Sequence, residues 1–123
     1  MSDHDQVTAT RLRGISVIRL AGEIDMANSP GISRAIVRSL GDTVAVLVDL
    51  TDVTFLDSAG VRLLDVLIGD LEDHRVPVRL VVDETGAAHM TLKLCAFRDD
   101  LLSTDQDQAA DELRSQAAYP GSP

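Results

Sequence analysis

Aromatic residues are scarce in this chain of 123 residues, which has no tryptophan, one tyrosine and two phenylalanines. Proteins that bind single-stranded nucleic acids stack the bases on aromatic side chains, so that class is disfavoured. Basic residues are also few: 11 Lys and Arg stand against 20 Asp and Glu, which gives a net charge of −9. Such a chain is a poor counterion for a phosphate backbone or an anionic lipid surface. We therefore expect no nucleic-acid and no membrane partner.

Cysteine and long apolar runs are scarce as well. Cys95 is the only cysteine, so no internal disulfide and no thiolate cluster for zinc or iron can form. We expect Cys95 to be a small buried hydrophobic residue. The most apolar uninterrupted segment, residues 44–48, is far too short to cross a bilayer, and residues 1–6 are polar and acidic, unlike a signal peptide. These features predict a cytoplasmic protein.

Residue patterns of the common catalytic and cofactor sites are missing. The histidines, His4, His74 and His89, are scattered, and a lone histidine is most often an ordinary surface residue. The glycine-rich loops that bind nucleotide phosphates do not occur, and the residues around Ser58 do not match the nucleophile elbow of a hydrolase. We expect a protein that is not an enzyme, with no catalytic residues, no metal site and no cofactor.

The hydrophobic pattern predicts one α/β domain over residues 7–116, with flexible termini at residues 1–6 and 117–123. Hydrophobic residues make up 45% of the chain and charged residues 25%, which is normal for a globular domain. We expect strands at residues 7–12, 15–21, 44–48, 76–82 and 101–103, and helices that begin near residues 29, 58, 85 and 104 and end near 40, 73, 95 and 116. Strands that alternate with helices favour a mixed sheet with an antiparallel first hairpin and parallel crossovers.

Two of these elements carry particularly clear signals. For the first helix, Ser29 is expected to be the N-cap, Pro30 suits the first helical position, and Gly41 is a natural stop. Residues 44–48 are apolar on both faces, which predicts a central buried strand. The second helix is expected to pack on the sheet beside residues 44–48 through Gly60 and an apolar stripe of Val61, Leu64, Ile68 and Leu71, widened by Leu63 and Leu67.

Residues 54–60 lead from this central strand into the second helix and form the best candidate site. Sites in open α/β sheets lie at the carboxyl ends of parallel strands. Ser58 stands at a helix start, where free backbone N–H groups and the helix dipole favour negative charge. Two interpretations of Ser58 stay open. It is an N-cap with no other role, or it is a phosphorylation site with Arg62 four residues on and within reach of the phosphate. Gly60 has no side chain, so a partner could approach closely there.

The same residues carry a family resemblance. Residues 46–60, which read VLVDLTDVTFLDSAG, resemble the core signature of STAS domains, a family that includes anti-sigma factor antagonists and takes part of its name from sulfate transporters. Residues 20–25 (LAGEID) resemble that family's second strand and following turn. The similarity covers about residues 7–116. It implies a mixed sheet of four or five strands with helices packed mainly on one face.

The resemblance also implies a mechanism called partner switching. An anti-sigma factor with a histidine-kinase-like ATPase fold holds a sigma factor inactive, and the unphosphorylated antagonist binds that anti-sigma factor and frees sigma. The anti-sigma factor then phosphorylates a serine of the antagonist and ejects it, and a phosphatase resets the cycle. Ser58 occupies the phosphoacceptor position, Asp57 precedes it, and Asp25 lies in the turn near the same surface. With Gly60 and Arg62 they form the predicted partner-binding set.

Other possibilities remain open at this point. Many members of the family end the third helix with Thr-Gly or Ser-Gly, where this chain has Cys95-Ala96. If that position needs a positive φ, alanine costs about 1 kcal/mol relative to glycine. STAS domains also serve as accessory subunits of lipid-transporting ABC systems and in stress-signalling assemblies. In the transport case Ser58 would be only a contact residue. An enzyme or nucleotide-binding module in the same groove is disfavoured, because no acid/base or metal constellation is present.

Overall fold

The computed structural model describes residues 6–118 and shows one five-stranded sheet with four α-helices. The strands are β1 (Val7–Leu12), β2 (Ile15–Ile24), β3 (Val46–Leu56), β4 (Val78–Val81) and β5 (Leu102–Ser103). The helices are α1 (Ser29–Leu40), α2 (Ser58–Asp73), α3 (Ala87–Leu94) and α4 (Gln106–Ala118), with a short 3₁₀ turn, η2 (Asp99–Leu101), before β5. The predicted order of elements is confirmed. Residues 1–5 and 119–123, which belong to the termini predicted to be flexible, lie outside the described residues.

The sheet is mixed, as predicted. The strand order is β1-β2-β3-β4-β5, with β1 antiparallel to β2 and each of the other neighbouring pairs parallel. The hairpin turns at Arg13 and Gly14, whose φ angles are 53° and 88°. Two central residues with positive φ are typical of the tight turns whose twist matches that of the flanking strands.

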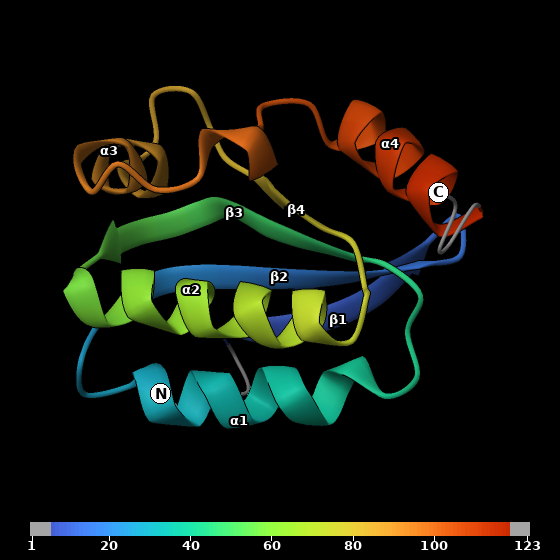
Figure 1. Ribbon diagram of the computed structural model, residues 1–123. Coiled ribbons are helices and arrows are strands. Elements are labelled where there is room, and N and C mark those ends of the chain that lie inside the picture. The colour runs from blue at the N-terminus through green and yellow to red at the C-terminus, as the bar shows by residue number, and fades with distance from the viewer. Residues whose placement is uncertain (1–5, 119–123) are drawn as a thin grey trace.

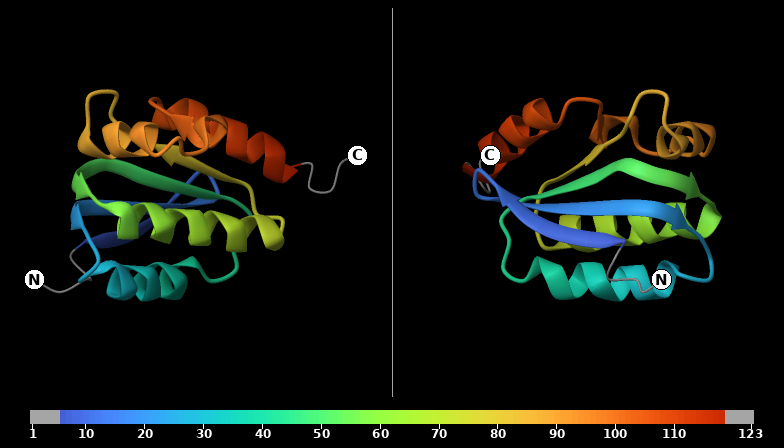
Figure 2. Two further views of the ribbon diagram at one scale, coloured as in Figure 1. Left: turned by 60° about the vertical axis from the view of Figure 1, so that its left-hand side comes forward. Right: turned by 180° about the vertical axis from the view of Figure 1, so that it is seen from behind.

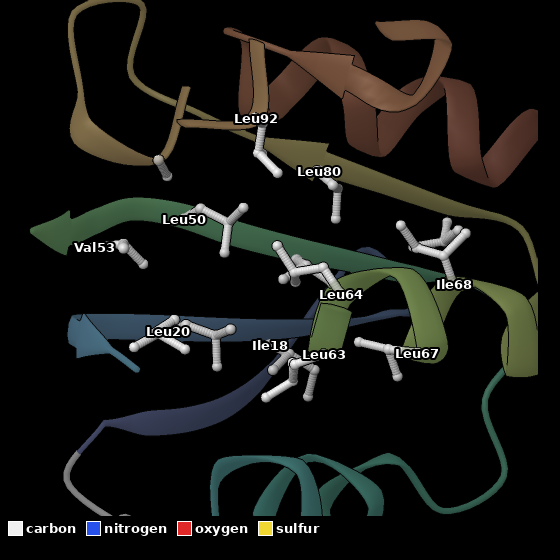
Figure 3. Close-up of a cluster of buried hydrophobic side chains, with 14 of the residues drawn as sticks. Ile18, Leu20, Leu50, Val53, Leu63, Leu64, Leu67, Ile68, Leu80 and Leu92 are labelled. Carbon is white, nitrogen blue, oxygen red and sulfur yellow. The ribbon is translucent and has the colours of Figure 1, made fainter. Parts of the chain in front are cut away.

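Alternating side chains divide the core into two layers. Ile18 and Leu20 of β2 and Val48 and Leu50 of β3 face α1, α2 and α3, in the larger cluster of buried residues. Figure 3 shows side chains of α2 and Leu92 of α3 converging on this face of the sheet. Three of the four helices therefore pack on one face, and the predicted arrangement is confirmed.

The opposite face of the sheet carries a smaller cluster. It is built from residues of β2, β3, β4 and α4, namely Ile15, Val17, Ala45, Leu47, Val81, Ala109, Ala110 and Leu113. Figure 2 shows that α4 and α1 lie on opposite sides of the sheet. Both faces of β3 are covered, and residues 46–48, which are apolar on both faces, are fully buried as in a central strand.

Two details of the expected elements are wrong. Val44 is 61% exposed and precedes β3, which starts at Val46 and runs to Leu56 through residues expected to be a connection. The strand continues because Leu50, Val53 and Leu56 still reach the core. At α1 the N-cap position belongs to Asn28, not to Ser29, and no side chain caps this helix.

The carboxyl ends of β2 and β3 and the N-termini of α1 and α2 meet at one end of the molecule, at the left in Figure 1. Helix α3 lies at the same end. The fold thus brings residues 24–29 beside residues 56–60, and this end is where the sequence places its candidate site.

Candidate functional site

Asp57 and Ser58 have different roles at the start of α2. Asp57 has extended backbone angles, and its Oδ1 accepts hydrogen bonds from the backbone N–H groups of Ala59 at 2.9 Å and Gly60 at 3.1 Å. Asp57 is therefore the N-cap, and Ser58 is the first helical residue. The interpretation of Ser58 as the cap is wrong. Its side chain is exposed and makes no hydrogen bond within residues 6–118.

The Asp57 carboxylate also joins two loops. Its Oδ2 accepts a hydrogen bond from the Met26 N–H at 3.2 Å, and the Asp57 N–H donates to the Ile24 carbonyl at 3.2 Å. The segment between β2 and α1 is thereby held against the beginning of α2. Residues more than 30 positions apart in the chain form one surface around Ser58.

Asp25 stabilises its own turn. Its Oδ1 accepts hydrogen bonds from the N–H groups of Ala27 at 2.9 Å and Asn28 at 3.0 Å, while Asn28 Oδ1 accepts from the Asp25 N–H at 2.9 Å. Asn28 also donates from Nδ2 to the Glu23 carbonyl at 2.8 Å. Because its side chain is used in this turn, Asn28 does not cap the N-terminus of α1. The turn places Asp25 and Asp57 at the same end, so two negative charges lie in the loops around Ser58.

Gly60 has the packing role that the sequence predicts, which is to let α2 lie close to the sheet. The residue is buried, and a Cβ built on it would lie 2.3 Å from Leu56 Cδ1 and 3.1 Å from Ile24 Cγ2. The absent side chain lets the first turn of α2 approach the ends of β2 and β3. The space at Gly60 is thus filled from inside the protein, and the expectation that a partner approaches there stays a prediction.

A pocket of about 590 Å³ opens beside Ser58, between the first turns of α2 and the segment that follows α3. Its lining includes Ser58, Arg62 and Asp65 of α2, and Cys95 to Arg98 on the other side. Cys95 is exposed, so the expectation of a buried cysteine is wrong. The chain leaves α3 at Cys95 and turns away at Ala96, which has a φ of 52°. The condition stated for this pair is therefore met, and Ala96 adopts the positive φ that glycine would favour.

Exposed apolar side chains gather at the same end of the molecule. Met26 lies in the turn after β2, Phe55 near the end of β3, and Met90 and Leu94 on α3, and all four rank among the exposed large hydrophobic residues. Thr54 is exposed too. No pattern in the sequence distinguished these residues from core positions, because exposure here depends on where the helices end.

The structure brings Asp25, Asp57, Ser58 and Arg62 to one end, whereas His74 and His89 lie in separate segments and His4 lies outside the described residues. His74 and His89 each have Nδ1 within hydrogen-bond distance of a backbone carbonyl of their own segment. Within residues 6–118, no group of three or more His, Cys, Asp or Glu side chains is arranged to hold a metal ion. In the same part of the chain, no helix is long and apolar enough to cross a membrane.

Three of the solved structures with similar folds are of anti-sigma factor antagonists. One from Mycobacterium paratuberculosis is 27% identical, with a TM-score of 0.75 over 93% of this chain and 99% of its own. Unphosphorylated SpoIIAA is 18% identical, with a TM-score of 0.69 over 89% of this chain and 96% of its own. Phosphorylated SpoIIAA from Bacillus is 20% identical, with a TM-score of 0.65 over 88% and 99%. The two SpoIIAA structures support the fold alone.

The sequence was also compared with curated proteins and with protein families. No curated protein matches the chain in sequence. The family model described as "STAS domain" matches residues 6–109, which include every strand, the first three helices and the Asp57–Ser58 junction. The chain therefore belongs to the STAS domain family.

Proposed function

We propose that this protein is an anti-sigma factor antagonist that is switched by phosphorylation of Ser58. Its partner would be an anti-sigma factor with a histidine-kinase-like ATPase fold, acting in the cytoplasm. Binding of the unphosphorylated protein would release the sigma factor, phosphorylation would end the binding, and a phosphatase would restore it. The observation that carries the proposal is the exposed Ser58 hydroxyl on a rigid frame at the carboxyl end of the central strands.

The hydrogen bonds of Asp57 support this proposal. Because Asp57 caps α2, the Ser58 hydroxyl is not needed to hold the helix and is free to react. The tie between Asp57 and Met26 fixes the neighbouring turn, so a partner would meet a preformed surface. The exposed side chains of Met26 and Phe55 offer apolar contact area beside the hydroxyl.

The chemistry of the switch is a phosphoryl transfer. Ser58 Oγ would form a bond to the γ-phosphorus of the kinase's ATP, the bond to the leaving ADP oxygen would break, and the hydroxyl proton would be released. The phosphate adds about −1.5 to −2 charges at neutral pH. Asp25 and Asp57 already place negative charge at this end. A hundredfold loss of affinity requires about 2.7 kcal/mol, which repulsion at a contact surface can supply.

Phosphopeptide mapping and calorimetry test the proposal. Kinase-type anti-sigma factors encoded near this gene, and those captured on the immobilised protein, are incubated with it and ATP. We expect phosphate on Ser58, with labelling abolished by Ser58→Ala and unchanged by Thr54→Ala, which removes another exposed hydroxyl nearby. Calorimetric titration should show that Ser58→Ala keeps most of the binding and that Ser58→Glu weakens it. Phosphate on Thr51, Thr54 or Ser29, or equal affinity of Ser58→Glu and the wild type, would contradict the proposal.

A further inference from the structure

The pocket beside Ser58 is bordered by two arginines in different states. Arg98 donates from Nη1 to both carboxylate oxygens of Glu72, at 2.8 and 2.9 Å, and from Nη2 to Asp100 at 3.0 Å. These bonds raise the pKa of the Arg98 guanidinium above its ordinary value, and the bond to Asp100 has the largest effect. Arg98 is therefore occupied by two carboxylates and holds η2 against the end of α2.

Arg62, in contrast to Arg98, is not paired with a carboxylate in the described part of the chain. It is exposed, lines the same pocket, and makes no ion pair within residues 6–118. It follows Ser58 by four residues on α2, a spacing that places two side chains on the same helix face with Cβ atoms about 5–6 Å apart. Asp65, three residues further along α2, is the one acidic residue that lines this pocket, and it does not pair with Arg62.

We propose that this pocket receives the phosphoryl group of phosphorylated Ser58 and that Arg62 is its ligand within the same molecule. The inference rests on the proposed function and assigns Arg62 a second role in it. In the unphosphorylated protein the guanidinium is free to contact a partner. In the phosphorylated protein it turns to the phosphate, because a guanidinium matches two phosphate oxygens with two parallel hydrogen bonds.

Phosphorylation would then change the partner surface in two ways. It adds negative charge at Ser58, and it withdraws the positive charge of Arg62 into an internal ion pair. A partner that pairs an acidic side chain with Arg62 would lose that contact at the moment when it meets the phosphate. The pocket volume of about 590 Å³ leaves room for the phosphoryl group without displacing the segment from Cys95 to Arg98.

Phosphorus NMR on the full chain tests this ligand directly. Phosphoserine is inserted at position 58 during translation, and the phosphate is titrated between pH 4 and pH 8. Its second pKa is ordinarily about 6. Since a nearby cation favours the doubly charged form, we expect Arg62→Gln to raise that pKa by about half a unit to one unit. Arg62→Lys should raise it less. Arg38→Gln, which removes an exposed arginine near the far end of α1, should leave it unchanged.

Two results would overturn the inference. One is a phosphate pKa in Arg62→Gln equal to that of the unsubstituted phosphoprotein. The other is an equal rise in Arg38→Gln, which would mean that net charge alone sets the pKa. Arg62 is exposed, so its variants should fold, and circular dichroism checks this. Because the titration contains no partner, failure of the anti-sigma proposal would appear separately, as absence of binding or of labelling at Ser58.

Discussion

At the scale of single residues, Asp57 stabilises the start of α2, and the adjacent Ser58 keeps an exposed hydroxyl. The Asp57 side chain accepts three backbone hydrogen bonds, one from the turn after β2 and two from the first turn of α2, while the Ser58 side chain accepts none within the described residues. A serine that capped α2 could not be modified without loss of the cap. The assignment of the cap to Asp57 removes that conflict and leaves the hydroxyl exposed.

The stabilities of two alanine variants should reflect this division. Asp57→Ala removes the N-cap of α2 and the bond to Met26, so we expect it to lower the free energy of unfolding by about 1–2 kcal/mol. Ser58→Ala should change it by less than about 0.5 kcal/mol, as an exposed substitution without a contact does. Urea unfolding followed by circular dichroism measures both. A loss from Ser58→Ala as large as that from Asp57→Ala would mean that Ser58 also supports the helix.

Ala96 is a second residue where the backbone decides the outcome. Its φ of 52° lies in the left-handed region, which costs an alanine about 1–2 kcal/mol. Ala96→Gly should therefore raise the free energy of unfolding by about 1 kcal/mol after the larger entropy of the unfolded glycine chain is subtracted. The control is Ala87→Gly at the first residue of α3, where glycine should only destabilise. An Ala96→Gly variant no more stable than the wild type in chemical denaturation would argue against the left-handed turn.

At the scale of elements, α2 connects the site to the core. Asp57 caps its start and Ser58 is its first residue, while its buried face from Leu63 to Leu71 packs on the sheet (Figure 3). The close approach at Gly60 fixes how near the helix start lies to the ends of β2 and β3. The position of the Ser58 hydroxyl is therefore set by packing along the whole helix.

The packing of α2 is tested by one buried and one exposed substitution. Leu64 is fully buried, and Leu64→Ala should cost about 2–5 kcal/mol of unfolding free energy because it leaves a cavity against the sheet. Val66 lies on the outer side of the same helix and is 52% exposed, so Val66→Ala should change the stability little. Denaturant midpoints compare the two. Similar midpoints for both variants would mean that the buried face is assigned incorrectly.

Helix α4 adds an ion-paired contact that depends on pH. Asp111 accepts hydrogen bonds from Arg114 of the same helix and, at 2.8 Å, from Arg13 in the β1–β2 turn. The bond from Arg114 is the largest cause that lowers the pKa of Asp111 below its ordinary value of 3.8. A carboxylate with a lowered pKa stabilises the fold above its unfolded pKa, and this contribution is lost as the pH falls through the folded pKa.

The lowered pKa of Asp111 predicts how the stability of a variant should depend on pH. Asp111→Asn should lower the stability by a constant small amount between pH 5 and pH 7, because the pair is exposed and screened. The difference from the wild type should shrink as the pH is lowered below about 4, where the wild-type carboxylate takes up a proton. Thermal unfolding across this range measures it. Glu84→Gln, at an exposed residue that forms no ion pair in the described part of the chain, is the control and should show no such trend.

At the scale of the whole molecule, charge decides which partners are accessible. The net charge of −9 is spread over the chain, while the basic side chains are few and many are paired with carboxylates, as Arg13, Arg19 and Arg98 are. Long-range attraction will therefore favour partners with a basic surface. Arg62 is one of several basic side chains that form no ion pair within residues 6–118, and among them it is the one that lines the pocket beside Ser58.

The same charge predicts the behaviour of the protein towards DNA. We expect the full chain not to retard duplex DNA in a gel shift at physiological salt, since it offers no basic surface to replace counterions. Lowering the salt should not change this result. Retention of one DNA sequence in preference to others would contradict a role through protein partners.

Local patterns in the sequence were sufficient for the element order, for the span of α2 and for the junction at Asp57 and Ser58. These features depend on hydrophobic periodicity and on residues that begin or end helices, which act over a few neighbouring positions. The positive φ at Ala96 was only a condition at the level of sequence, because helix ends often use the left-handed region but alanine disfavours it. The extent of β3 could not be predicted, since its second half is a strand only because α3 and α2 cover Leu50, Val53 and Leu56.

The sequence by itself determined that this is one acidic α/β domain with a serine at a strand-to-helix junction, because spacing and composition are local quantities. Which side chain caps the helix, whether Cys95 and Thr54 are buried, and which arginine beside Ser58 is free depended on the tertiary structure. Each of these rests on contacts between residues far apart in the chain, such as Asp57 with Met26 and Arg98 with Glu72. No local pattern encodes those distances, since they arise only when the helices and strands pack together.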